Sequence, residues 1–276
     1  EVETVRRTLE PLLVGRRVSR VELRRADIVE GDRSASALLE GSTIEAIRRH
    51  GKQMALIGSG AGAGRALIVH LGMTGQLVHH ATRPDLSSTN HVHAVWTMET
   101  CAATKREPAG VLVFRDPRRF GGLWPLSLDA LRDRWSELGP DALEATGEGL
   151  RERGGRSARA VKGVLLDQSV VAGVGNIYAD EALFRAGIRP TRGARRVRRE
   201  EWDALALAIG GVMRAALEAG GSTVRDYVGG TGERGQAQLG HAVYGRMSEP
   251  CIGCGATLKG GVVAQRTTVW CARCQR

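Results

Sequence analysis

Residues 251–274 read CIGCGATLKGGVVAQRTTVWCARC and contain four cysteines in two pairs, Cys251-x2-Cys254 and Cys271-x2-Cys274. Sixteen residues separate the pairs, and Arg266 lies between them. Two Cys-x2-Cys turns at this separation can wrap one tetrahedral zinc ion, which orders a segment too short and too polar to hold itself together. The stretch therefore predicts a metal-tied hairpin with a basic loop, of a kind suited to nucleic acid.

The composition limits the classes of protein to which the chain can belong. Its 276 residues are 42% hydrophobic, which leaves room for two hydrophobic cores. Forty Lys and Arg residues stand against thirty Asp and Glu, for a net charge of +10. Such a balance is typical of proteins that bind phosphate groups, although a basic surface that serves only solubility is the alternative.

Hydropathy and cysteine use indicate the compartment. The sequence has no run of eighteen apolar residues and no basic-then-apolar leader, so we expect neither a membrane span nor secretion. The fifth cysteine, Cys101, has no other cysteine near it in the sequence. A metal-bound quartet suits a reducing cytosol better than disulfides do. We therefore expect a cytoplasmic protein, and a monomer by default.

Hydrophobic periodicity predicts a β-rich first half. Residues 1–14 show the three- and four-residue spacing of a helix. The period then changes to short strand-like runs at 18–23, 43–47, 54–57, 66–71, 91–98 and 111–114. Many short strands with few helices between them predict an antiparallel sandwich or barrel.

The second half has helical periodicity. We predict helices at 131–138, 161–166, 177–186 and 202–217, and a loose glycine-rich patch at 147–155. The fold class is therefore α+β. Its predicted segments are a β-sandwich domain with a leading helix at 1–126, a linker at 127–155, a helical domain with a polar loop at 156–240, and the metal hairpin at 241–276.

The segment from Lys162 to Asn176 is a first candidate for phosphate binding. A helix ends near Gln168, a turn with Gly173 and Gly175 follows, and Asn176 stands where an N-cap would open the next helix. Such a helix-turn-helix can aim backbone N–H groups, the Asn176 amide and the Lys162 ammonium at one DNA phosphate. A corner of two helices that merely packs explains the same pattern equally well.

Two turns are candidates for contacts with bases. Asp116–Gly121 reads DPRRFG, so that Arg118 could reach base edges and Phe120 could wedge between base pairs. His70–Gly75 reads HLGMTG, in which Met73 is either a second wedge or a flexible core residue. Phe120 is likewise either a wedge or a core residue at a β-turn.

Two histidines alternate along a predicted strand. This spacing places His91 and His93 on one face of it. No cluster of carboxylates accompanies them in the sequence, so we expect a phosphate contact rather than a second metal site.

Together these motifs resemble those of the formamidopyrimidine-DNA glycosylases, bacterial base-excision repair enzymes that remove oxidised purines such as 8-oxoguanine. The resemblance runs along practically the whole chain. It rests on Glu1–Arg7, His70–Gly75, Asp116–Gly121, Gly173–Tyr178, Gly220–Thr223, Val243–Arg246, Ala264–Arg266 and the cysteine hairpin. It implies a β-sandwich domain, a helix-two-turn-helix domain with a lesion-capping loop at 156–240 and a zinc-finger hairpin, with damaged duplex DNA clamped between the domains.

The resemblance also implies roles for single residues. Met73, Arg118 and Phe120 match the triad that fills the space left by an extruded base. Lys52 matches the lysine that assists elimination after the base is removed, and Arg266 shares this catalytic assignment. The phosphate contacts that it implies are Lys162, Asn176, Arg266, His91 and Arg159. The implied ligands of one structural zinc ion are Cys251, Cys254, Cys271 and Cys274. The implied compartment is the bacterial cytoplasm, at the nucleoid.

One departure from the family concerns the reaction itself. Family members begin with Pro-Glu-Leu-Pro directly before the Glu-Val-Glu that opens this chain, and that proline and glutamate supply the nucleophile and the acid. The stretch is absent from the sequence as given. An α-amino group titrates near pH 8, so a useful fraction is neutral and nucleophilic at pH 7. We expect the stretch to precede Glu1 in the complete protein, and a catalytically silent DNA-binding relative is the alternative.

Two other functions fit part of the pattern. An endonuclease VIII-like enzyme would act on oxidised pyrimidines, but the Arg118–Phe120 turn and the long Gly229–Gly240 loop favour the purine enzyme. A non-catalytic zinc-containing protein would keep the hairpin and the basic surface without the chemistry. The spread of motifs along the chain favours a bifunctional glycosylase and AP lyase.

Overall fold

The computed structural model describes residues 1–61, 63–86, 89–99, 110–222 and 227–276, so Cys101 lies outside the described residues. The chain forms two compact units, each with its own hydrophobic core. The first comprises Glu1–Trp135 and Ala219–Gln236, and the second comprises Ser136–Glu218 and Ala237–Arg276. The stretch 219–236, placed by the sequence analysis in the helical domain, thus belongs by its contacts to the first unit.

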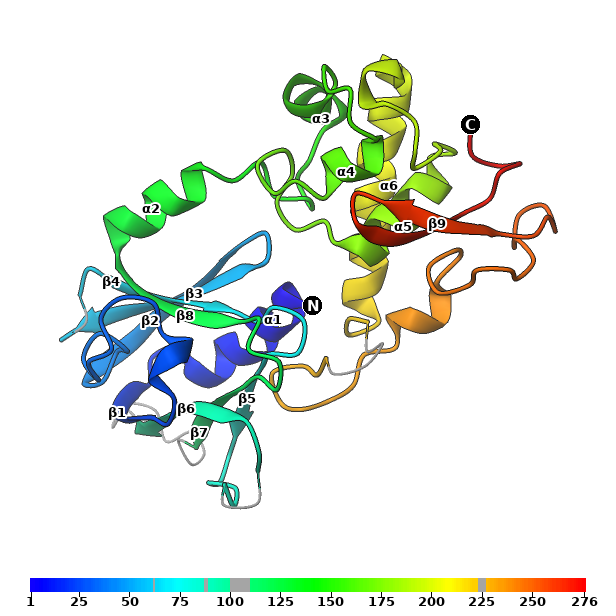
Figure 1. Cartoon of the computed structure of the whole chain (residues 1–276). Helices are drawn as coiled ribbons and strands as arrows, with labels where there is room; N and C mark the ends of the chain where they lie inside the picture. The colour runs from blue at the N-terminus through cyan, green and yellow to red at the C-terminus, as the bar shows by residue number, and fades with distance from the viewer. Residues whose placement is uncertain (62, 87–88, 100–109, 223–226) are drawn as a thin grey trace. The chain divides into compact units, whose positions relative to one another are not determined.

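The first unit is built on an antiparallel sheet (Figure 1). Its strands are β1 (Arg17–Leu23), β2 (Ser42–His50), β3 (Gln53–Gly60), β4 (Arg65–His70), β5 (Gln76–His80), β6 (Val92–Glu99), β7 (Val111–Arg115) and β8 (Gly122–Ser127). Their order is β5-β7-β6-β1-β2-β3-β4-β8. β1 and β2 pair only where Arg17 faces Thr43, so the sheet divides there into two four-stranded halves. The predicted β-sandwich is confirmed.

The first helix, α1 (Val2–Leu13), contacts β2, β3 and β5. Its apolar residues recur every four positions, so that Val5, Leu9 and Leu13 lie on one side and are fully buried. The helix therefore closes the core of the first unit, as its sequence periodicity predicts.

A carboxylate on α1 fastens the helix to β2. Glu3 accepts hydrogen bonds from Arg6 and Arg7 on its own helix and from Arg49 at 2.9 Å. Partial burial raises the pKa of Glu3, but the three guanidinium groups outweigh it and lower that pKa to about 2. A lowered pKa stabilises the fold above the ordinary pKa of 4.5, and this contribution is lost as the pH falls toward 2.

Two strands escaped prediction, and both lie at the edges of the sheet. They are β5 and β8, which stand first and last in the strand order. β8 contains Gly122 and Pro125, residues that weaken a strand signal but are tolerated at an edge, where one row of N–H groups needs no partner. β5 is only five residues long and ends in His79 and His80.

The second unit is helical and carries the C-terminal hairpin. Its helices are α3 (Gly147–Gly154), α4 (Val161–Leu165), α5 (Asn176–Arg185) and α6 (Arg199–Glu218), and its strands are β9 (Lys259–Val263) and β10 (Arg266–Trp270). A further helix, α2 (Leu128–Ser136), lies almost wholly in the first unit. The predicted stripe of α6 is confirmed, because Trp202, Leu205 and Ile209 are fully buried in the core of the second unit.

The loose patch expected at 147–155 is in fact the helix α3. Thr146 caps it, since its hydroxyl accepts a hydrogen bond from the Gly149 N–H at 3.1 Å. Leu150 is fully buried in the core, and a side chain at Gly154 would collide with Val164. The glycines that suggested a loop therefore permit close packing of a short helix.

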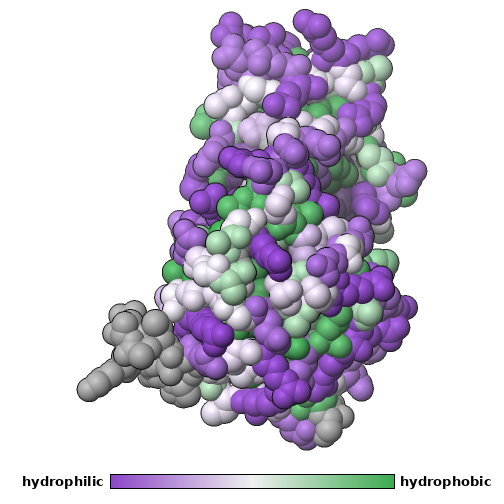
Figure 2. Space-filling model, turned by 90° about the vertical axis from the view of Figure 1, so that its left-hand side faces the viewer, coloured by the Kyte–Doolittle hydropathy of each residue, from purple (hydrophilic) through white to green (hydrophobic). Residues whose placement is uncertain are grey.

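No helix in the described part of the chain is long and apolar enough to cross a membrane. The face drawn in Figure 2 mixes polar and apolar residues without one broad apolar band.

A buried glutamate on α5 holds the segment that leads to the hairpin. Glu181 is 1% exposed, and its carboxylate accepts hydrogen bonds from the N–H groups of Ala242, Val243 and Tyr244 at 2.8 to 2.9 Å. A carboxylate accepts several such bonds at once, and each is stronger than a bond between neutral groups.

Glu181→Gln is expected to lower the free energy of unfolding by about 2–4 kcal/mol, because a neutral amide offers one acceptor to three buried donors. Urea denaturation of the two proteins measures this difference. Glu200→Gln, at the exposed start of α6, is the matched control and should change stability by less than about 0.5 kcal/mol. Equal unfolding midpoints for the two variants would contradict the role of Glu181.

Candidate nucleic-acid interface and metal centre

Four thiol groups converge at the base of the hairpin. The Sγ atoms of Cys251, Cys254, Cys271 and Cys274 all lie within 4.8 Å of one another. Two separations are 3.9 Å, between Cys251 and Cys274, and 3.5 Å, between Cys254 and Cys271. A tetrahedral ion with metal–sulfur bonds of about 2.3 Å needs sulfur atoms roughly 3.8 Å apart. The four cysteines therefore fit one metal ion and fill all of its tetrahedral positions.

A buried glutamine, which the sequence analysis missed, connects this cluster to the helical core. Gln275 is fully buried. Its Oε1 accepts a hydrogen bond from the Cys271 N–H at 2.8 Å, and its Nε2 donates to the Ile188 carbonyl at 2.9 Å. This amide side chain therefore helps to attach the metal-binding segment to the residues that follow α5.

A two-residue turn between β9 and β10 determines where Arg266 lies. Ala264 and Gln265 have φ of 49° and 60°, and two consecutive positive φ values are what a type I′ hairpin turn requires. Arg266 is thus the first residue of β10, opposite Val263, and its side chain is exposed. A guanidinium at the tip of a metal-tied hairpin is available to an anion.

Lys162, a predicted phosphate contact, is buried in this structure. This residue has no exposed surface, and its ammonium forms an ion pair with Asp180 at 2.7 Å. It also donates hydrogen bonds to Thr268 Oγ1 at 2.7 Å and to the Thr267 carbonyl at 3.1 Å. The ammonium thus has two hydrogen bonds, one ion pair and no exposed surface, so a phosphate cannot reach it in this structure. Lys162 instead ties α4 to α5 and β10.

Burial governs the protonation of this pair. It lowers the pKa of the Lys162 ammonium and raises that of the Asp180 carboxyl to about 6, and the attraction between the two groups opposes both shifts. Asp180 also accepts a hydrogen bond from the Val269 N–H at 3.2 Å. Removal of either partner would leave the other charge buried and unpaired, which strongly destabilises a protein.

Asn176 begins α5 rather than capping it, since Gly175 occupies the N-cap position. Its Nδ2 donates a hydrogen bond of 3.0 Å to the Thr267 carbonyl, the same oxygen that accepts from Lys162. Its Oδ1 has no partner among the described residues. One carbonyl next to Arg266 therefore brings Asn176, Lys162 and the hairpin tip together.

In the first unit, one carboxylate joins the two loops that were predicted to contact bases. Asp116 has no exposed surface. It accepts hydrogen bonds from the Thr74 hydroxyl, from the Arg118 N–H at 3.2 Å and from the Gly121 N–H at 2.7 Å. Because Thr74 follows Met73 directly, Asp116 fixes the loop of Met73 against the loop of Arg118.

The three predicted triad residues protrude from these loops. Met73 is 66% exposed and Phe120 is 54% exposed, which excludes the alternative that they are core residues. The Arg118 guanidinium lies 4.7 Å from the centre of the Phe120 ring. A Cβ atom at Gly72 would stand 2.6 Å from the Phe120 backbone, so only glycine permits this approach of the two loops.

Lys52 lies in the turn between β2 and β3. Its carbonyl accepts a hydrogen bond of 3.1 Å from Nδ1 of His70, a residue that the sequence analysis quoted within a motif without giving it a role. Burial lowers the pKa of His70, and the edge of its ring packs against Trp124. His70 is the last residue of β4 and directly precedes the loop of Met73. Its hydrogen bond therefore connects that loop to the turn of Lys52.

The two histidines of the predicted strand are not equivalent, which corrects that expectation. β6 begins at Val92, so the exposed His91, with φ of 66°, lies outside the strand. His93 is 2% exposed, and its Nε2 donates to the Asp116 carbonyl at 2.8 Å. His91 lines a cavity of about 410 Å³ together with Arg25 and Arg119.

Arg159 is exposed in the loop before α4 and forms an ion pair of 2.9 Å with Asp167. A phosphate contact by this arginine would have to compete with that carboxylate.

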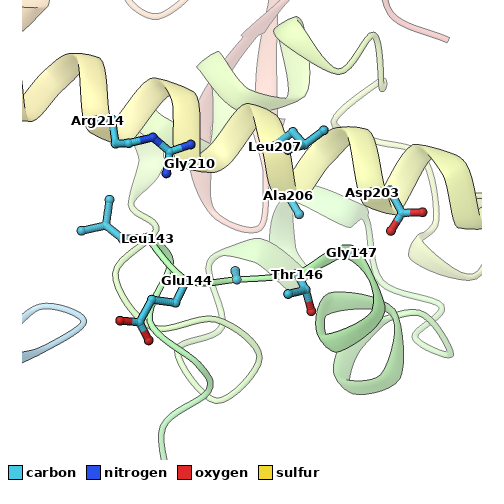
Figure 3. Close-up of a pocket in the computed structure, with 10 residues that line it drawn as sticks. Leu143, Glu144, Thr146, Gly147, Asp203, Ala206, Leu207, Gly210 and Arg214 are labelled. Carbon is cyan, nitrogen blue, oxygen red and sulfur yellow. The ribbon is translucent and has the colours of Figure 1, made fainter.

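A cavity of about 430 Å³ lies between α6 and residues 143–147 of the second unit (Figure 3). Glu144 and Arg214 stand at its sides, and Asp203 lies farther along α6. Its lining includes none of the predicted site residues and neither a histidine nor a cysteine. It therefore offers no arrangement for the chemistry considered above.

Two family models match the chain. Residues 1–123 match the formamidopyrimidine-DNA glycosylase N-terminal domain, and residues 138–228 match the formamidopyrimidine-DNA glycosylase H2TH domain. A formamidopyrimidine-DNA glycosylase from Solibacter usitatus is 40% identical over 278 residues, which cover 100% of this chain and 98% of the relative. One from Bacillus subtilis is 39% identical over 283 residues, which cover 100% and 97%.

Solved structures agree with these matches. The MutM (Fpg) protein of Thermus thermophilus superposes with a TM-score of 0.85 at 39% identity and covers 100% of this chain and 97% of its own. Lactococcus lactis Fpg, in complex with DNA that contains an abasic site, superposes with a TM-score of 0.87 at 31% identity, and the match covers 100% and 98%. Because relatives of this family are about 40% identical over the whole chain and share its fold, the chain belongs to the formamidopyrimidine-DNA glycosylase family.

Proposed function

We propose that this chain is a DNA glycosylase and AP lyase of base-excision repair that removes oxidised purines from damaged duplex DNA. The observation that carries the proposal is the pair of loops joined by Asp116, which exposes Met73, Arg118 and Phe120 together. An enzyme that extrudes a base must fill the space left in the stack, at a cost of a few kcal/mol. Relatives bound to DNA with an abasic site or with Fapy-dG support the choice of substrate.

Residues of each unit are proposed to contact the phosphates around the extruded nucleotide. We assign these contacts to Arg266 and Asn176 in the second unit and to His91 in the first, with Arg159 as a further contact. We give Lys162 a different role, because its ammonium is buried and already binds Asp180, Thr268 and Thr267. It is a positioning residue that holds Asn176 and the hairpin tip at one place.

The metal of the hairpin is zinc in this proposal. Four thiolates with tetrahedral spacing are the ligand set that structural zinc prefers, and they leave no open position for water. The ion would supply folding energy to the hairpin and would take no part in the reaction. In this proposal the enzyme acts as a monomer in the bacterial cytoplasm, at the nucleoid.

The reaction needs an amine nucleophile. In the proposed mechanism the secondary amine of an N-terminal proline attacks C1′ of the damaged nucleotide, and the base leaves with its bonding electrons and takes up a proton. The sugar ring then opens, as the C1′–O4′ bond breaks, O4′ takes up a proton and the nitrogen loses one, which leaves an iminium at C1′. The iminium acidifies the C2′ proton, so that β-elimination breaks the 3′ C–O bond and δ-elimination then breaks the 5′ C–O bond. Lys52, in a turn supported by His70, is suited to moving protons during elimination.

Borohydride trapping tests the nucleophile. A chain with Pro-Glu-Leu-Pro placed before Glu1 should form a covalent complex with a duplex containing 8-oxoguanine, because borohydride reduces the iminium to a stable amine. The matched control carries Gly-Ser before that proline, which turns its nitrogen into an amide with no nucleophilicity. Gel electrophoresis separates the adduct. Equal trapping by the control would contradict the assigned nucleophile, and no trapping by the first chain would contradict the glycosylase function.

In the chain with Pro-Glu-Leu-Pro before Glu1, Asp116→Asn is expected to slow excision by roughly 10- to 100-fold, because an amide in place of the carboxylate loses acceptor capacity toward three donors and loosens both loops. The fluorescence of 2-aminopurine beside the lesion reports base extrusion, and single-turnover kinetics report excision. Asp129→Asn, at an exposed position of α2, is the matched control. Urea denaturation separates a loosened loop from a lost fold. Unchanged extrusion in Asp116→Asn would refute the role given to this carboxylate.

Arg266→Ala is expected to weaken binding of lesion duplex by about 10-fold and to reduce the salt dependence of binding by about one phosphate contact. Its zinc content, measured by atomic absorption, should stay at the level of the unmodified chain. Cys271→Ser should instead lose zinc and unfold the hairpin, because three thiolates no longer close the tetrahedron. Undiminished affinity in Arg266→Ala would remove this arginine from the interface.

A further inference from the structure

Two arginine-rich loops of the second unit are joined into one rigid surface. An antiparallel bridge pairs Ala160 with Gly193. The Ala194 N–H donates to the Arg159 carbonyl at 2.9 Å, and the Arg195 N–H donates to the Ser157 carbonyl at 3.0 Å. Ala194 is fully buried and packs in the core of the second unit, which holds the joined loops against that core.

This surface carries more positive charge than its own carboxylates neutralise. Arg156, Arg195 and Arg196 are exposed, and none of them has a carboxylate partner in the part of the chain that the structure describes. Glu201, a carboxylate at the start of α6, instead binds Arg192 and Arg198. We call Arg156, Arg195 and Arg196 the arginine surface.

The pairing of Glu201 is firm. Partial burial raises its pKa, but hydrogen bonds from Arg192 and from the Arg198 backbone and side chain outweigh that effect and lower the pKa to about 2. Glu201 therefore stays charged and paired at neutral pH, and it does not become a partner for Arg195 or Arg196.

The arginine surface adjoins the proposed phosphate contacts within the same unit. The Val161 N–H, at the start of α4, donates to the Arg192 carbonyl at 2.7 Å, and the next residue is Lys162. Arg159, a proposed phosphate contact, belongs to the first of the two loops, and its carbonyl accepts the hydrogen bond from Ala194 that joins them. A guanidinium binds phosphate through two parallel N–H donors and is weakly hydrated, so unpaired arginines on a rigid backbone suit a phosphate ligand.

We propose that the arginine surface binds phosphates of the DNA backbone beyond the extruded nucleotide. It would thereby extend the footprint of the enzyme on duplex DNA without reading sequence or damage. The inference rests on the proposed function, since it deepens the description of the same substrate. An acidic protein would recognise the same charges, but continuity with Arg159 and α4 favours DNA.

The double variant Arg195→Gln with Arg196→Gln tests this proposal. Kd for a 25-base-pair duplex, with and without 8-oxoguanine, is measured by fluorescence anisotropy across a range of salt concentrations. Loss of two phosphate contacts should reduce the slope of log K against log salt by about 1.8 and weaken binding roughly 10- to 100-fold near 100 mM salt. Damaged and undamaged duplexes should lose affinity equally, because the contacts carry no information about the lesion.

The matched control is Arg20→Gln with Arg132→Gln, which removes the same charge from positions of the first unit that are 72% and 76% exposed. It should change Kd and slope much less. Arg195→Lys with Arg196→Lys should restore most of the slope, since it keeps the charge. Single-turnover excision by the Pro-Glu-Leu-Pro chain at saturating enzyme should be unchanged in the Arg195 and Arg196 double variant.

Two results would overturn the proposal. One is a double variant whose Kd and salt slope match those of the Arg20 and Arg132 control. The other is unchanged DNA binding together with lost binding of polyglutamate, which would assign the surface to an acidic protein. Both leave trapping by the Pro-Glu-Leu-Pro chain intact, whereas failure of the proposed function abolishes it.

Discussion

The organisation of the second unit depends on a lysine and an aspartate that water does not reach. Each has lost its hydration, and their attraction offsets that loss only because Thr268, Thr267 and the Val269 N–H complete the hydrogen bonds. An apolar pair of similar volume would stabilise the same position at least as well. What the ion pair adds is geometry, because it admits one arrangement of α4, α5 and β10. That arrangement places the Asn176 amide and the hairpin tip beside a shared carbonyl.

The first unit solves a similar problem with a single carboxylate. Met73 and Phe120 contribute little hydrophobic stabilisation to the fold, because more than half of each residue remains exposed. Their loops must therefore be held by something other than the residues that would act on DNA. Asp116 does this with no exposed surface, and Gly72 permits the backbones to touch. In both units a buried charged group positions the proposed functional residues.

A feature of the fold or of the site could be predicted from the sequence where it depends on residues that are close together in the chain. The cysteine pairs, the stripe of α6 and the central strands depend on spacing within short windows, and they were predicted. The burial of Lys162 depends on Asp180 and Thr268, which are far from it in the sequence, so its charge suggested a surface role. The helix α3 and the edge strand β8 were missed because glycine and proline usually indicate loops, whereas here they serve close packing and a sheet edge. The Met73 and Phe120 turns were recognised, but their exposure could be decided only by the structure.

The cysteine cluster and the proposed phosphate contacts are connected although no cysteine contacts Lys162 in the network described above. β10 runs from Arg266 through Thr267 and Thr268 to the strand end at Trp270, directly before Cys271. Releasing the metal would free this strand, and the Thr267 carbonyl and Thr268 hydroxyl would leave with it. Lys162 would then be a buried ammonium with Asp180 as its remaining partner, and Asn176 would lose its hydrogen bond. Under the proposed function, a closed set of thiolates would therefore govern DNA binding without touching DNA, because the strand that it anchors completes the hydrogen bonds of the buried ion pair.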